Sequence, residues 1–239
     1  MRPGEFYFNG RSSLDYRLVI QTQPKRKAPN RRIKSFTVTG QSGTVYQTRE
    51  QRDDMALDLS MVFLSEPDDF KREAVSDLFD VPGYVDFVPY YDQNYIYRAM
   101  VTDGVTFDHV RAYKRATVVT VTLMLHPHKW LKTGLLHLPF TDGQIINNPT
   151  KLVASPVIDI TATGDTTITI GGQNYHFIGL SGTTTVDSEL LTATSGGQNV
   201  AHKMVGLEYP KLPPGVTTIG MSSNVTSLVI QPRFVRRVS

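Results

Sequence analysis

Hydrophobic and polar residues alternate in short runs along most of the chain, which is the pattern of β-strands. The clearest run is residues 116–125, where Val119, Val121, Leu123 and Leu125 fall on one face and more polar residues on the other. Shorter runs rich in β-branched and aromatic residues precede it throughout the first half. The pattern predicts a mainly β protein, with strands throughout its first half.

One segment follows a helical period instead. Its apolar residues are Phe70, Ala74, Val75, Leu78 and Phe79, which share one face of a helix. Before them, the hydroxyl of Ser65 offers an N-cap and Pro67 suits a first turn, and Pro82-Gly83 ends the pattern. We expect one amphipathic helix over about residues 67–80, packed against a sheet.

After residue 150 the apolar runs shorten and turn residues become frequent. Gly, Asn, Asp and Pro separate the runs, a spacing that favours an antiparallel β-sandwich. Residues 167–177 contain Gly171-Gly172 between two alternating stretches, and this predicts a β-hairpin with a tight turn.

Charge divides the chain at about the same place as the strand pattern. Residues 1–134 carry 19 Lys and Arg against 16 Asp and Glu, whereas residues 135–239 carry six of each sign. The second part is instead rich in Thr, Gly and Ser. This shift near Lys132–Gly134 predicts two domains, residues 1–134 and 135–239.

Several functional classes have no support in the sequence. The chain has no cysteine, which rules out disulfides and thiolate metal sites. It has no apolar run of the ~18–20 residues that span a bilayer and no secretion signal at its start, so we expect a protein made in the cytoplasm and not bound to membrane. P-loop, GxGxxG, HExxH and GxSxG patterns are absent, so no enzyme activity and no cofactor are expected.

The most unusual stretch is residues 25–34, which holds six positive charges and no acid. Pro24 and Pro29 suit an extended segment. Charge concentrated in this way favours binding to phosphate or to an acidic protein surface, with a merely solvated loop as the alternative. Nucleic-acid binding is a weaker alternative, since no RNP, KH or helix-turn-helix pattern accompanies the charge. The candidate interface residues are Lys25, Arg26, Lys27, Arg31, Arg32 and Lys34.

Two other features have alternative interpretations. His126 and His128 could both contact a metal ion from one strand, but without further ligands nearby a surface or interdomain role is favoured. The aromatic-rich segment 84–97 could stack on a sugar, but in a β-rich domain a core or subunit-interface role is the default. Its aromatic residues are Tyr84, Phe87, Tyr90, Tyr91, Tyr95 and Tyr97.

The order of several short phrases resembles the distal tail proteins of long-tailed siphophages across nearly the whole chain. The phrases are residues 6–10 (FYFNG) followed by Asp15-Tyr16, residues 38–43, residues 126–130, and residues 212–219 with 230–236. Arg17 stands where glycine is usual in the first phrase, and Gln41 where a basic residue is common in the second.

The resemblance implies a structural, non-enzymatic hub of the tail tip, at the distal end of the virion tail. Its N-terminal domain would be a β-sandwich or tube-like domain with one α-helix, forming a hexameric ring that continues the tail tube, with DNA only in transit through the channel. The basic segment 25–34 would be a loop or arm that docks on an adjacent subunit or ring. The C-terminal domain would be a galectin-like antiparallel β-sandwich that projects outward. Partners would be the tail tube protein and fibre or receptor-binding proteins. The alternative function is a carbohydrate-binding module for attachment to the host cell wall.

Overall fold

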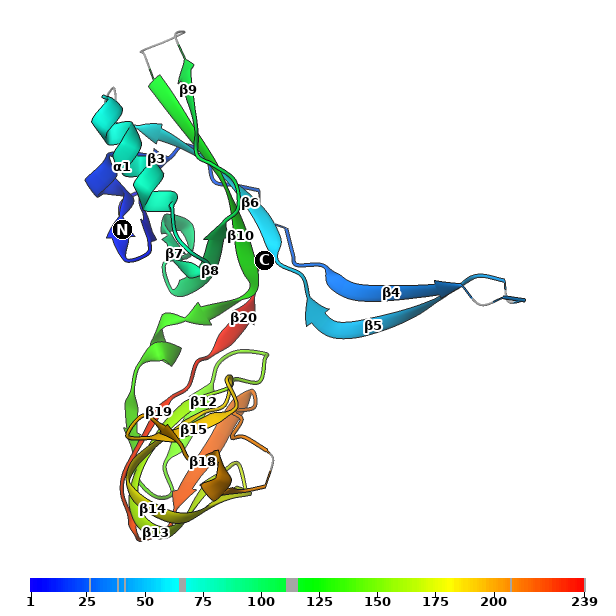
Figure 1. Cartoon of the computed structure of the whole chain (residues 1–239), viewed down its shortest axis with the longest axis vertical. Helices are drawn as coiled ribbons and strands as arrows, with labels where there is room; N and C mark the ends of the chain where they lie inside the picture. Colours follow the sequence, from blue (N-terminus) through cyan, green and yellow to red (C-terminus); the bar gives the residue numbers. More distant parts are fainter. Residues whose placement is uncertain are drawn as a thin grey trace. The chain divides into compact units, whose positions relative to one another are not determined.

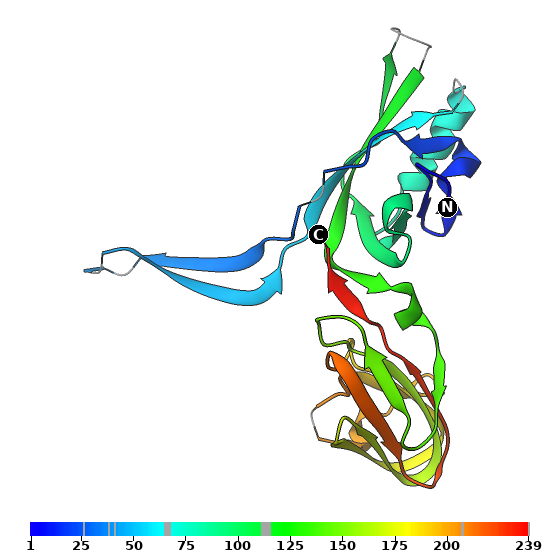
Figure 2. The same ribbon diagram turned by 180° about the vertical axis from the view of Figure 1, so that it is seen from behind.

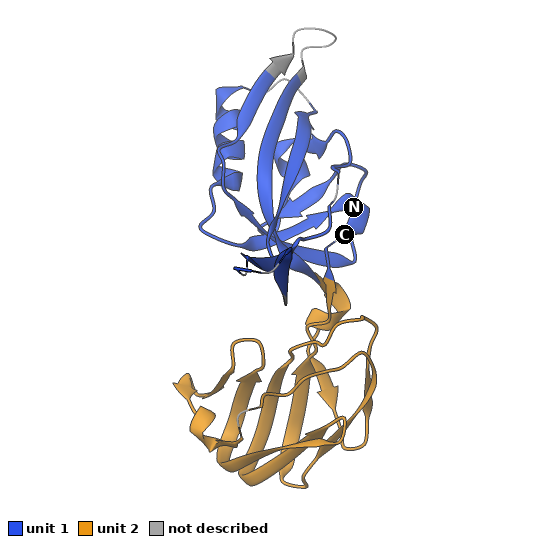
Figure 3. Ribbon diagram, turned by 90° about the vertical axis from the view of Figure 1, so that its right-hand side faces the viewer, with its two compact units in different colours: residues 1–129, 237–239 blue, residues 130–236 orange. Residues whose placement is uncertain are grey.

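The computed structural model describes residues 1–25, 27–37, 39–40, 42–64, 68–110, 116–206 and 208–238, and of residues 48–50, 109–110 and 116 it describes the backbone only. The chain forms two compact units, shown in Figure 3. Unit 1 comprises residues 1–129 and 237–239, and unit 2 comprises residues 130–236. The expected mainly β fold class is confirmed. The two compact units are not the same as the predicted domains 1–134 and 135–239, and that division stays a prediction.

Unit 1 is built on one antiparallel sheet with the strand order β2-β1-β7-β8-β10-β6-β3 (Figure 1). Strand β9 also pairs with β10, the long strand to which the 116–125 pattern belongs. The bounds are β1 Phe6–Phe8, β2 Arg11–Ser12, β3 Leu18–Ile20, β6 Met55–Phe63, β7 Val85–Pro89, β8 Tyr95–Val101, β9 Thr106–Val110 and β10 Ala116–Leu131, with short 3-10 helices η1 Ser13–Tyr16 and η2 Tyr90–Asp92.

The core of unit 1 lies between this sheet and the helix α1, Asp69–Phe79. Strand β6 lies beside β10 with Leu57 opposite Leu123 and Leu59 opposite Val121, so the aliphatic face predicted for residues 116–125 faces the core. From the helix, Val75, Leu78 and Phe79 are buried against Phe6 and Phe8. Burial of this apolar surface is the main stabilising contribution to the unit.

The start of the helix differs from the prediction. Asp68 is the N-cap, because its carboxylate accepts the backbone N–H of Lys71 at 2.8 Å. Ser65 and Pro67, which the prediction used, lie outside the described residues. The N-cap is three residues later than predicted, because the Asp68 carboxylate satisfies a free backbone N–H of the first turn.

Strands β4 (Arg31–Thr37) and β5 (Thr44–Arg52) form a separate two-stranded antiparallel sheet within unit 1, which we call the β4–β5 ribbon. Figure 1 and Figure 2 both show the ribbon extending away from the main sheet of its unit. Every residue of β4 is exposed.

Unit 2 is a curled antiparallel sheet with the main strand order β11-β19-β13-β14-β15-β16, in which β18 pairs with both β12 and β13. The long strand β13 pairs with β19 through Val157–Ala162 and with β18 through Ile168–Ile170, so its two halves have different neighbours on that side. The bounds are β11 Leu138–Phe140, β12 Ile145–Asn148, β13 Val157–Ile170, β14 Gln173–Asp187, β15 Thr192–Ser195, β16 Gln198–Asn199, β17 Met204–Val205, β18 Gly215–Met221 and β19 Val225–Gln231, with η3 Lys132–Leu135 and η4 Ala201–Lys203. Strand β20, Val235–Arg237, instead pairs with β10.

Glycines permit the bends of these long strands. The β13–β14 register shifts between Gly164 and Thr166, where Gly164 has φ +87°, a value that a side chain would strain. The hairpin predicted for residues 167–177 is confirmed, with Ile170 opposite Gln173 and a turn at Gly171 and Gly172 (φ +59° and +84°), the left-handed conformation of a two-residue turn.

Candidate assembly surface

The structure places the predicted basic residues at and before the β4–β5 ribbon. Lys25 and Lys27 are exposed in the extended segment before β4, and Arg31, Arg32 and Lys34 are exposed on β4 itself. Arg26 lies outside the described residues. Strand β4 therefore brings together three of the six predicted residues. Within the described part of the chain, β4 pairs only with β5.

The ribbon also carries apolar side chains on both of its faces. Ile33 and Tyr46 share one face and are 55% and 65% exposed, and Phe36 lies directly opposite Val45 on the other face, with 48% and 45% exposure. A two-stranded hairpin is at best marginally stable by itself in water. Apolar surface that a subunit leaves exposed in this way is typical of a protein–protein contact.

Only part of the charge on the ribbon is neutralised. Arg32 Nε lies 2.6 Å from Asp53 Oδ1, and this hydrogen bond raises the pKa of Arg32 further above its usual range. In contrast, Lys25, Lys27, Arg31 and Lys34 form no ion pair with any residue that the structure describes. The ribbon thus presents a basic and apolar surface.

The base of the ribbon gathers further positive charge. Arg31 is directly opposite Arg52, and like charges in this position repel. Burial, followed by the nearby Arg237 and Arg31, lowers the pKa of Arg52, whose Nη1 donates to the carbonyl of Pro29 at 2.7 Å. Around β4 the surface forms a shallow hollow of about 670 Å³, lined by Asn30, Arg31, Arg32, Ile33, Lys34 and Asp53.

Sequence reasoning found the charge of this surface but missed its apolar half. The signal was present: in the stretch 33–36, Ile33 and Phe36 are an odd number of residues apart, so a strand places them on opposite faces. A strand that buries one face in its own domain would have its apolar residues on a single face.

The two histidines on β10 belong to a polar cluster at the base of the ribbon. Their rings are 5.6 Å apart, and the ring of Tyr84 meets His126 edge-on at 6.0 Å. Tyr84 donates a short hydrogen bond to Asp54, and burial together with this bond raises the pKa of Tyr84 to about 12. Within the described residues, no group of three or more His, Asp or Glu side chains could hold a metal ion.

The aromatic-rich segment 84–97 lies mainly in the core of unit 1. Phe87 and Tyr97 are buried, and Tyr90, Tyr91 and Tyr95 pack against the same core. Among the described residues of unit 2, no Phe, Tyr or Trp is exposed. Of the described aromatic residues in these two regions, Tyr84 alone is exposed, at 40%. Neither region therefore presents a group of open aromatic faces on which a sugar ring would stack.

The fold is that of a known class of phage protein. The SPP1 Dit protein (gp 19.1), described as a paradigm of the hub adsorption apparatus in phages that infect Gram-positive bacteria, superposes with a TM-score of 0.71 over 95% of this chain and 96% of that chain, at 14% sequence identity. The chain has the distal tail protein fold. The fold implied by the sequence resemblance is thus confirmed.

A second solved structure matches the chain less well. The baseplate of phage P2, in its activated conformation with Ca, matches with a TM-score of 0.49 at 9% identity, over 92% of this chain and 91% of that chain. No protein-family model and no curated protein sequence matches the chain. Within the described residues, none of the helices has the length and apolar character to cross a bilayer.

Proposed function

We propose that the chain is a structural subunit of a phage tail-tip hub, located at the distal end of the virion tail. In this proposal, residues 1–134 form a hexameric ring that continues the tail tube, and residues 135–239 project outward toward fibre or receptor-binding proteins. DNA passes through the channel of the ring only in transit, and the role is structural and not enzymatic. The distal tail protein fold, shared over nearly the full length with a hub protein, supports this role.

The observation that carries the assembly part of the proposal is the β4–β5 ribbon. It has only two strands, is exposed throughout β4, and presents Ile33, Phe36, Val45 and Tyr46 to solvent. A closed ring requires a head-to-tail interface in which each subunit presents two different surfaces. The ribbon, with Lys25, Arg26, Lys27, Arg31, Arg32 and Lys34, serves as one of these surfaces and docks on the next subunit or on the tube.

The test is the native mass of the purified protein over a range of concentrations, by light scattering and native mass spectrometry. We expect a six-subunit species, or two such rings stacked. Replacing Ile33 and Tyr46 by Ser should remove this species while leaving the unfolding transition of the subunit in place. The matched control replaces Leu190 and Leu191 by Ser, because these residues are 70% and 58% exposed on unit 2. A strict monomer at every concentration would contradict the proposal.

The alternative, a carbohydrate-binding module, is distinguished by retention of the full-length protein on host wall polysaccharide. No aromatic residue that the structure describes in unit 2 is exposed, so the sandwich offers no stacking surface and we expect no retention.

A further inference from the structure

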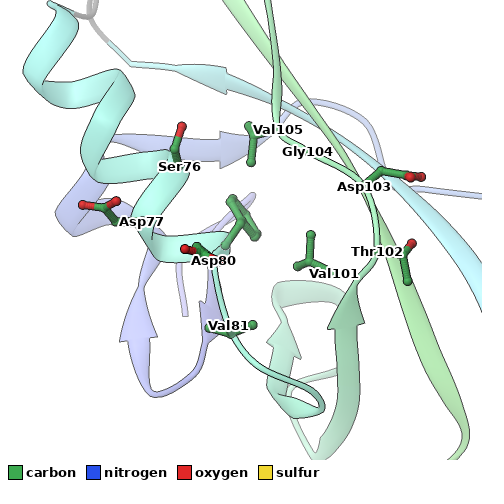
Figure 4. Close-up of a pocket in the computed structure, with 10 residues that line it drawn as sticks. Ser76, Asp77, Asp80, Val81, Val101, Thr102, Asp103, Gly104 and Val105 are labelled. Carbon is green, nitrogen blue, oxygen red and sulfur yellow. The ribbon is translucent and has the colours of Figure 1, made fainter.

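A groove lies in unit 1 between the C-terminal end of α1 and the segment that joins β8 to β9. It has a volume of about 490 Å³, and we call it the α1–β9 groove. In Figure 4, Val101 and Val105 point into the gap from one side, while Asp77 and Asp103 point away from it at the two rims. Partly buried valines therefore line the groove, and exposed acids stand at its edges. Its lining residues are Ser76, Asp77, Phe79, Asp80, Val81, Val101, Thr102, Asp103, Gly104 and Val105.

The acidic rim is not neutralised within the subunit. Asp77, Asp80 and Asp103 are exposed, and none of them forms an ion pair with a residue that the structure describes. Two of these carboxylates also lie where they weaken the helix: Asp77 is in its last turn and Asp80 is its C-cap, with no basic residue in that turn. Because the C-terminal end of a helix is negative, carboxylates there are unfavourable unless a cation approaches.

The β4–β5 ribbon has the opposite composition. It combines unneutralised cations, Arg31 and Lys34, with exposed apolar side chains such as Ile33 and Phe36. The groove combines unneutralised carboxylates with partly buried valines. No residue of the ribbon lines the groove of its own chain, so one subunit presents both surfaces at once.

We propose that the α1–β9 groove receives the β4–β5 ribbon of a second copy of this chain. Arg31 and Lys34 lie against the carboxylates of Asp77, Asp80 and Asp103. The apolar side chains of the ribbon cover the partly buried Val81, Val101 and Val105. The cations also stabilise the end of α1, so docking relieves the unfavourable position of Asp77 and Asp80. This inference rests on the proposed head-to-tail ring and assigns the second of its two surfaces.

Charge reversal tests the pairing. The double variant Asp77→Lys/Asp103→Lys should weaken self-association by more than about tenfold, since like charges facing each other across an interface repel. Arg31→Glu/Lys34→Glu should do the same, and the variant with all four changes should recover much of the loss. The control Asp15→Lys/Asp108→Lys makes the same change of charge at two exposed acids of unit 1 outside the groove and should associate as the unchanged protein does.

Cross-linking gives a readout that does not depend on charge. The chain has no cysteine, so mixing the single variants Lys34→Cys and Asp103→Cys under oxidising conditions should give a disulfide-linked pair of different chains. Lys34→Cys mixed with Asp108→Cys should not.

Each outcome separates this inference from the proposed function. If the ring forms normally in Asp77→Lys/Asp103→Lys and the Lys34–Asp103 cross-link does not form, the docking site is wrong. The proposed hub role is then unaffected. A protein that is monomeric at every concentration overturns both.

Discussion

The ammonium group of Lys129 lies 2.5 Å from Asp92 Oδ2, and the two side chains are only 8% and 16% exposed. Tyr97 donates a short hydrogen bond to the same carboxylate, and Lys129 Nζ also lies 4.5 Å from the centre of the Tyr95 ring. The pair joins the end of β10 to the η2 turn. A buried ion pair of this kind adds little net stability, but losing one partner leaves an uncompensated charge.

We therefore expect Lys129→Met to destabilise unit 1 by about 3–5 kcal/mol, because Asp92 would remain buried without its cation. The free energy of unfolding, measured by chemical denaturation, gives the size of the loss. Lys151→Met is the control, since Lys151 is exposed, and should change little. The combined variant Lys129→Met/Asp92→Leu should be more stable than Lys129→Met alone; equal stability of the two would argue against a buried charge as the cause.

Gly134 should not tolerate any side chain. A Cβ added there would lie 2.6 Å from the backbone nitrogen and 2.9 Å from the Cβ of Phe234, and Gly134 accepts the backbone N–H of the neighbouring Arg233. We expect Gly134→Ala to destabilise unit 2 by more than about 2 kcal/mol, since backbone must move to relieve the overlap. Gly104→Ala, where an added Cβ meets nothing within 4 Å, should be nearly neutral in the same thermal-unfolding measurement.

Arg17 occupies a left-handed conformation, with φ 55° and ψ 29°, at the end of η1. At this position the distal tail proteins that the sequence resembles usually have glycine. A side chain in this conformation is strained. Arg17→Gly should stabilise unit 1 by up to about 1 kcal/mol. Arg17→Ala retains the Cβ and should give no gain, so a rise in unfolding temperature for both variants would point to the loss of charge instead.

The stability of unit 1 should fall in mild acid because of His128. Burial, followed by the positive charge of His126, Arg237 and Arg52, lowers the pKa of His128 below its ordinary 6.5. Above about pH 6.5 the imidazole is neutral in both the folded and the unfolded chain, and burial of His128 does not reduce the free energy of unfolding. Below it, the unfolded chain takes up the proton first, so stability is lost as the pH falls toward the folded pKa.

Unfolding measured at pH 7.5 and pH 5.5 should show this loss, and His128→Gln should reduce it. His137→Gln is the control, because His137 is exposed. An unchanged pH dependence in His128→Gln would assign the loss to other groups.

Regular elements could be predicted where one face of a segment meets a core. The aliphatic face of residues 116–125, the helical spacing from Phe70 to Phe79 and the glycine turn at 171–172 each depend on neighbouring residues alone, and each was correctly predicted. The helix start was misplaced because Ser65 and Asp68 can both cap a helix, and sequence does not say which one the preceding chain allows.

Long-range pairing could not be predicted in the same way. The backbone N–H of Val238 donates to Pro127 at 3.0 Å, and Val238 is buried in the core of unit 1, yet no local pattern near residue 238 indicates that the chain returns there. For the candidate assembly surface, the charge density of residues 25–34 could be read from the sequence, but its role in assembly stays a prediction. The acids of the α1–β9 groove were not found, because Asp77 and Asp103 are 26 positions apart in the sequence and only the fold brings their segments together.

The return of the chain to unit 1 makes unit 2 an insert between two points of the first unit. Its incoming and outgoing segments run together, since Leu131 donates its backbone N–H to Phe234 at 2.9 Å. A module whose two ends are adjacent can be lengthened, shortened or exchanged during evolution without moving the rest of the chain. Unit 2 is thus a part of the chain that can be exchanged as a whole while the fold of unit 1 is kept.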